Sequence, residues 1–254
     1  MIDERRRRVL AELRPYIEAA RTFSGWSFGD VRVTHLEPGP PWDYEALVRD
    51  HAARASSILD LGTGGAEFFS RVLVGLNVRA VATEEWHVNA PIARDALAPL
   101  GGSLVRASAE RALPFRDGAF ELIIDRHEAI APVDVARVLA PGGTFITQQV
   151  DNGNWREIDA FFGRRQSSGD HFNEYQPQLR AAGCEVTAQR HEWKVAYGGL
   201  GDLVYMLLVA PWEVPDFDPE AEIDTLIRIE DALGTARGIE LTFARYLVIA
   251  RKPA

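Results

Sequence analysis

The chain has 254 residues, enough for one large α/β domain with a sizeable core but too few for two independent domains. Its hydrophobic share of 46% and charged share of 26% are those of a folded globular protein and argue against a disordered or fibrous chain. The formal net charge of -9 repels phosphate backbones, so nucleic acid is an unfavourable partner.

The sequence begins with a predicted amphipathic helix over residues 1 to about 22. Its apolar stripe is formed by Val9, Leu10, Leu13 and Ile17. The one obvious basic run, Arg5 to Arg8, is interpreted as a solvated helix face, with a contact to a partner or nucleic acid as the alternative. An irregular, aromatic-rich segment and a second helix, capped by Asp43, follow. We expect residues 1–50 to form a helical cap or lid.

Signals for secretion, disulfides or membrane insertion are missing from the sequence. The N-terminus begins with charges, and the longest apolar runs are too short to span a bilayer. The single cysteine, Cys184, cannot form an internal disulfide, and no cysteine/histidine cluster has zinc-site spacing. We expect a cytoplasmic protein with no metal site and no membrane contact.

From residue 57 onward, short apolar strands alternate with amphipathic segments of helical length, which is the pattern of βαβ units and a parallel sheet. The predicted strands are 57–61, 78–83, 103–107, 120–125, 143–150, 184–195 and 241–251. The predicted helices are 66–75, 87–99, 132–139, 171–182, 199–209 and 219–234. A helical insertion at about 198–236 precedes the last strand, so that strand could run antiparallel. Residues 51–254 are expected to form the main domain.

A glycine-rich turn follows the strand at 57–61. Gly62 and Gly64 permit tight turns, and such turns serve nicotinamide, flavin and adenosyl cofactors alike, or only connect a strand to a helix. A dinucleotide fingerprint read from Gly62 needs a glycine where Glu67 stands. Together with Asp60, that acid would repel a pyrophosphate, so a cofactor with a cationic end suits the turn better.

The turn "DLGTGGA" resembles the first motif of the class I S-adenosylmethionine-dependent methyltransferases, with Ala66 at the position of the third glycine. The resemblance implies a three-layer, Rossmann-like α/β fold with a seven-stranded, mostly parallel sheet whose last strand is antiparallel. It also implies S-adenosyl-L-methionine as the cofactor, bound here by Asp60, Gly62, Thr63 and Gly64.

Further motifs of this family follow in order up to about residue 150. "VRAVATEEWHVN" places Glu84 where an acid binds ribose hydroxyls, with Glu85 as the adjacent alternative and Trp86 against the adenine or ribose. "VRASAERALPFRDGAFELIIDRHE" implies adenine contacts from Ser108, Ala109 and Glu110. "VARVLAPGGTFIT" resembles the family's helix-to-strand turn, which we interpret as structural. The acids at 84 and 85 could instead be ordinary helix N-terminal charges.

The segment "DRHEA" after the fourth strand contains the candidate catalytic residues. His127 could accept a proton from a hydroxyl or amine, because its ordinary pKa lies near 6.5. Glu128 could orient His127 or bind a cationic substrate, and Arg126 could contact the cofactor. The alternative is that His127 and Glu128 simply cap the next helix.

Substrate specificity is expected in the N-terminal segment and in the insertion, because loops at the carboxyl ends of parallel strands form the binding crevice. Further polar and aromatic candidates are Trp26, His35, Trp42, His171, His191, Glu192, Trp193 and Tyr197. "DRHE" stands where DNA amino-methyltransferases carry an Asn/Asp-Pro-Pro-aromatic motif, and the cysteine zinc module of some ribosomal RNA enzymes is missing. We therefore expect methyl transfer to O or N of a small molecule. An RNA or protein substrate, a non-catalytic cofactor-binding protein and a nicotinamide-dependent oxidoreductase are the alternatives.

Overall fold

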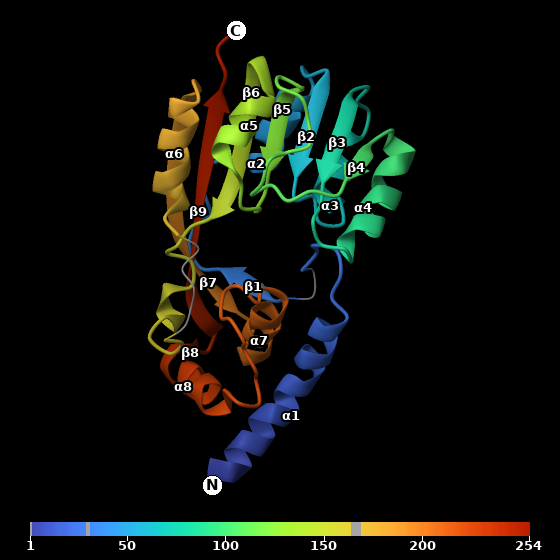
Figure 1. Cartoon of the computed structure of the whole chain (residues 1–254). Helices are drawn as coiled ribbons and strands as arrows, with labels where there is room; N and C mark the ends of the chain where they lie inside the picture. Colours follow the sequence, from blue (N-terminus) through green and yellow to red (C-terminus); the bar gives the residue numbers. More distant parts are fainter. Residues whose placement is uncertain (1, 29–30, 164–168) are drawn as a thin grey trace.

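One mixed β-sheet organises the computed structural model, which describes residues 2–28, 31–163 and 169–254 (Figure 1). The strands are β1 (Val33–His35), β2 (Ser57–Leu61), β3 (Arg79–Thr83), β4 (Ser103–Val105), β5 (Phe120–Asp125), β6 (Leu139–Val150), β7 (Glu185–Tyr197), β8 (Gly234–Thr235) and β9 (Gly238–Arg251). Their order is β1-β7-β9-β6-β5-β2-β3-β4, with β8 paired to β9. Strands β2 to β6 pair in parallel, whereas β9 is antiparallel to both β6 and β7. The predicted α/β fold with an antiparallel last strand is confirmed.

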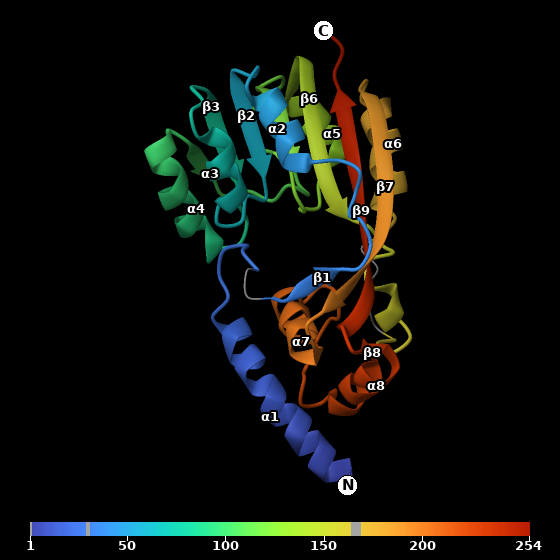
Figure 2. The same ribbon diagram turned by 180° about the vertical axis from the view of Figure 1, so that it is seen from behind.

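The helices form a layer on each face of this sheet. They are α1 (Ile2–Arg21), α2 (Tyr44–Ala52), α3 (Glu67–Leu73), α4 (Asn89–Leu97), α5 (Pro132–Val138), α6 (His171–Ala181), α7 (Leu200–Val209) and α8 (Ile223–Leu233). Short 3-10 turns follow at Ala98–Leu100 and Arg156–Ile158. Helices α2, α3 and α4 cover one face, and α5 and α6 cover the other (Figures 1 and 2). None of the helices in the described ranges is long and apolar enough to cross a membrane.

Strands β7 and β9 continue beyond the ends of the parallel strands. Strand β6 pairs with β9 only from Arg245 onward, while β7 pairs with β9 from Ile239 to Arg251. The free half of this ribbon packs against α7 and α8 in a separate hydrophobic cluster, and α1 lies along α7 and α8. The ribbon therefore carries a second lobe below the carboxyl edge of the parallel strands (Figures 1 and 2).

Four details differ from the sequence prediction. The segment expected to be irregular contains β1, which pairs with the end of β7, and the two-residue β8 was also not predicted. Strand β6 begins at Leu139 instead of residue 143, because the chain passes Pro141 with a shift of register against β5 and continues as a strand. Of the basic run, Arg5 and Arg6 are half-exposed but form ion pairs with acids of α8.

Candidate functional site

The glycine turn lies at the carboxyl end of β2 and leads into α3. Gly62, Gly64 and Ala66 all adopt the left-handed conformation, with φ values of 59°, 62° and 65°. This conformation is strained for any residue with a β-carbon, which explains the glycine that the family motif has at the position of Ala66. Thr63 is buried, and its backbone N–H donates to the carbonyl of Thr83 at 2.9 Å. The turn is therefore held against the end of β3.

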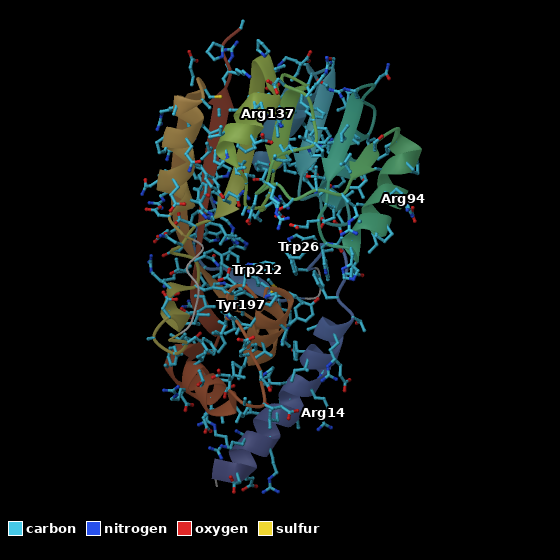
Figure 3. All side chains as sticks on the ribbon, viewed as in Figure 1. Arg14, Trp26, Arg94, Arg137, Tyr197 and Trp212 are labelled. Carbon is cyan, nitrogen blue, oxygen red and sulfur yellow. The ribbon has the colours of Figure 1, made fainter. Side chains whose placement is uncertain are left out.

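Two side chains cover this turn closely. A β-carbon built on Gly62 would lie 2.6 Å from the Glu128 carboxylate, and one on Gly64 would lie 2.8 Å from Cβ of Trp26. Figure 3 shows Trp26 directly below the edge of the sheet, with Trp212 beside it, and their rings stack at 5.8 Å. Only glycine leaves room for these contacts.

Glu84 binds the turn through backbone hydrogen bonds. Its two carboxylate oxygens accept from Gly64 N and Trp86 N, each at 2.7 Å. Burial raises the pKa of Glu84 above its usual value. Its neighbour Glu85 is exposed, and the Trp86 side chain is 39% exposed beside it. The structure thus distinguishes the two acids: Glu84 is buried and bonded to the turn, whereas Glu85 is exposed.

The acids Asp60 and Glu67 have different surroundings. Asp60 is buried at the end of β2, and burial raises its pKa to about 7. Glu67, expected to act on the cofactor by charge, instead accepts from Trp26 N at 2.7 Å. Asn89 accepts from Gly25 N at 2.8 Å. The carboxylate of Glu67 and the amide of Asn89 therefore fasten the N-terminal segment across the turn.

Asp125, the last residue of β5, was not predicted from the sequence. It is fully buried and accepts hydrogen bonds from Thr147 Oγ1 at 2.8 Å, Glu128 N at 2.9 Å and Gln149 Nε2 at 2.5 Å. Burial holds its pKa well above the usual range. It fixes the loop that carries His127 and Glu128. The signal was an acid closing an apolar strand, as Asp60 closes β2.

His127 is held in one orientation by the backbone of β6. Its Nδ1 lies 2.8 Å from the carbonyl oxygen of Gln148, which can only accept, so Nδ1 carries the proton. The second nitrogen, Nε2, therefore has a free lone pair in the neutral ring. Burial lowers the pKa of His127 well below its usual value, and nearby Arg245 and Arg126 lower it further. The ring is a neutral proton acceptor at physiological pH.

Glu128 lies against Gly62 in an acidic environment. Burial raises its pKa to about 7, and repulsion from Glu84, Glu110 and Glu85 adds to the shift. The structure thus brings the predicted cofactor residues after β2, β3 and β4 to one place. We define Asp60, Glu84 and Glu128 as the acidic side of the site.

The remaining predicted cofactor contacts differ in exposure. Ser108 is half-buried and Glu110 is exposed, while Ala109 is buried and accepts from Ala131 N at 2.8 Å through its carbonyl. Arg126 is exposed, with its guanidinium 5.0 Å from the Phe68 ring centre. It therefore lies on the α3 face, to one side of the turn.

Searches against protein-family models and curated proteins find no match in sequence. Similar solved structures include a protein of unknown function from Deinococcus radiodurans, with TM-score 0.61 and 18% identity over 94% of this chain and 99% of that one. A putative methyltransferase from Bacillus halodurans gives TM-score 0.58 and 17% identity over 83% and 99%. The cyclase SpnF gives 0.54 and 16% over 95% and 93%.

The chain has the class I methyltransferase fold. The strand order and the antiparallel last strand carry this assignment, and the structural neighbours include two putative methyltransferases. In this fold the cofactor turn follows the central strand, which is β2 here. A fold of this kind hosts several reactions, so the chemistry has to be argued from the site.

The other polar and aromatic candidates lie mainly around the β7–β9 ribbon of the methyltransferase fold. His35 stacks on Trp193 and accepts from its Nε1 at 2.9 Å, and His191 stacks on the same ring. Tyr197 is buried below them. Trp42 donates to Gln148 Oε1 at 2.7 Å, next to the backbone that holds His127. His35, His191 and Trp193 thus form one cluster of rings.

Two further candidates, His171 and Glu192, make structural contacts away from the glycine turn. His171 begins α6 and stacks on Tyr175. Glu192 forms an ion pair with Arg156. The described residues contain no group of histidine, cysteine and acidic side chains arranged to hold a metal ion.

Proposed function

We propose that this protein is an S-adenosylmethionine-dependent methyltransferase that acts on O or N of a small-molecule acceptor. The observation that carries the proposal is the acidic side of the site: Asp60, Glu84 and Glu128 surround a left-handed glycine turn at the carboxyl edge of the sheet. Buried acids with raised pKa values favour a cationic ligand and disfavour a pyrophosphate. The sulfonium and ammonium groups of S-adenosylmethionine satisfy that requirement.

The residues fit this cofactor. Glu84 is already oriented by two backbone N–H groups, and each carboxylate oxygen keeps a second lone pair for a ribose hydroxyl. Gly62 and Gly64 would hold the methionine end of the cofactor, and Ser108 and Ala109 would line the adenine site. Trp86 offers an exposed ring beside the ribose. When bound, the cofactor supplies an electrophilic methyl group on a positively charged sulfur.

The chain's own contribution to the reaction is positioning and proton removal. His127 is neutral, and its Nδ1–H bond to Gln148 leaves Nε2 to accept the proton of an acceptor hydroxyl or amine. Asp125 holds the His127 loop through Glu128 N. Trp26 covers the turn and excludes water from it. Such positioning can supply about 7 to 11 kcal/mol in ideal cases.

The alternatives differ in what they require of the site. A nicotinamide-dependent oxidoreductase has to place a pyrophosphate next to the acidic side, and an RNA substrate has to approach a chain of net charge -9. A non-catalytic cofactor sensor would need the same turn, but it would have no use for the neutral His127 as a proton acceptor. A small-molecule methyltransferase accounts for both features.

Equilibrium titration by calorimetry tests the cofactor assignment. We expect S-adenosylmethionine and its demethylated product, S-adenosylhomocysteine, each to bind one site per chain, and NADH to give no heat of binding. Binding of NADH without binding of either adenosyl compound would overturn the proposal.

A further inference from the structure

The guanidinium of Arg245 on β9 forms no ion pair with an acid in the described part of the chain. Among residues 2–28, 31–163 and 169–254, no carboxylate forms an ion pair with it. Its two hydrogen bonds both leave from Nη1, to Asn154 Oδ1 at 2.7 Å and to the carbonyl of Ala244 at 2.8 Å. Arg190 on the neighbouring strand β7, by contrast, is paired with Asp151. Arg245 therefore carries a positive charge that no carboxylate of the described residues pairs with directly.

The free edge of this guanidinium has a defined geometry. Because Nη1 is occupied, Nε–H and the Nη2–H groups are available, and together they form the planar fork that matches a carboxylate. The guanidinium is fixed in place because it lies 4.9 Å from the ring centre of Phe243 and 6.0 Å from that of Trp193. The residue is partly exposed, so a ligand can reach the fork. Burial lowers the pKa of Arg245 to about 10, which leaves it charged at neutral pH.

Arg245 also lies close to the proposed proton acceptor. Gln148, which holds His127, pairs with Leu247, and Val150 pairs with Arg245 two residues further along the same pair of strands. Two residues along a strand span about 7 Å. The positive charge of Arg245 adds to the effect of burial in lowering the pKa of His127.

We propose that Arg245 binds a carboxylate of the methyl acceptor, so that the substrate is an organic monoanion whose reactive hydroxyl or amine faces His127. This inference rests on the proposed function. One guanidinium without an ion pair matches one negative charge, whereas a phosphate dianion would bring a second negative charge into the field of Asp151 and Glu213, two acids that act on Arg245. The rings of Trp193 and Phe243 beside the fork favour an acceptor with an apolar or aromatic body.

The test uses benzoate, benzamide and phenyl phosphate as probes, titrated into the full chain saturated with S-adenosylhomocysteine and followed by tryptophan fluorescence. We expect benzoate to bind at least tenfold more tightly than benzamide and phenyl phosphate. Arg245→Met should reduce benzoate affinity to that of benzamide, and Arg245→Lys should give an intermediate loss because lysine keeps the charge without the fork.

Arg156→Gln is the matched control, since Arg156 is exposed and already paired with Glu192. It should leave benzoate binding unchanged. Equal binding of benzoate and benzamide, no benzoate binding, or full benzoate affinity in both Arg245 variants would overturn the inference. Tighter binding of phenyl phosphate would overturn the choice of a carboxylate. Calorimetric titration of S-adenosylhomocysteine into the same variants reports on the cofactor site separately, and we expect its affinity to be unchanged.

Discussion

The two halves of the carboxyl edge differ in charge. On the acidic side, Asp60, Glu84 and Glu128 are carboxyl groups whose pKa values are raised by burial. On the opposite side, next to β6 and β9, His127 is held neutral and Arg245 is an unpaired cation. We define His127 and Arg245 as the basic side. In the proposed function, the acidic side receives the cationic methyl donor and the basic side receives the anionic acceptor.

The largest expected effect comes from removing the proton acceptor on the basic side. In His127→Asn, the side-chain amide can keep the hydrogen bond to Gln148 but lacks Nε2. We expect methyl transfer to an acceptor hydroxyl or amine to fall by about 100-fold or more, while cofactor affinity stays the same. His51→Asn is the control, because the His51 Nδ1 makes the same kind of bond, to Leu47, away from the site. Equal activities of the two variants would remove His127 from the mechanism.

On the acidic side, the prediction compares the cofactor affinities of alanine variants at two neighbouring glutamates, Glu84 and Glu85. Glu84→Ala removes the charge-assisted hydrogen bonds from Gly64 N of the turn and from Trp86 N, as well as the proposed ribose contact. Each such bond contributes about 1.5 to 3 kcal/mol, so cofactor affinity should fall by roughly 10- to 100-fold. Glu85→Ala, at an exposed position, should change affinity by less than about threefold. Calorimetry measures both, and the reverse ranking would reassign the ribose contact to Glu85.

The acidic side should also make cofactor binding depend on pH. Glu128 and Asp60 have pKa values of about 7, so both are mostly protonated at pH 6 and mostly ionised at pH 8. A cationic ligand binds the ionised form better, so affinity for S-adenosylmethionine should rise by about 3- to 10-fold over this range. The uncharged sulfur of S-adenosylhomocysteine should show a smaller rise. If Glu128→Gln leaves the pH dependence unchanged, the charge of Glu128 has no part in binding.

The smallest expected effect concerns the left-handed backbone of the turn. Ala66→Gly loses a buried methyl group, worth about 0.8 kcal/mol, but relieves a strain of about 1 to 2 kcal/mol. Ala93→Gly, at a buried position inside α4, has no such relief and should lower the free energy of unfolding by about 1 to 2 kcal/mol. Chemical denaturation compares them. Equal destabilisation by both substitutions would show that Ala66 is not strained.

The sequence was most informative where local patterns determine structure. Alternating apolar and amphipathic segments predicted the strands, and Asp60 and Glu84 were placed because each lies at the carboxyl end of a strand. The basic side could not be predicted in this way, because it depends on pairing between strands that are distant in the sequence. Arg245 lies near His127 only because β9 pairs antiparallel with β6. Short strands such as β1 have no periodicity to detect, and the contact of Glu67 with Trp26 N depends on loop geometry.

The most direct test of the account is methyl transfer from radiolabelled S-adenosylmethionine into a cell extract separated into small-molecule, RNA and protein fractions. We expect label in the small-molecule fraction, retained on an anion exchanger at neutral pH, and at least about 100-fold less label with His127→Asn. Label in RNA or protein would contradict the small-molecule acceptor. Cofactor binding without transfer to any fraction would contradict the central claim that this site catalyses methyl transfer.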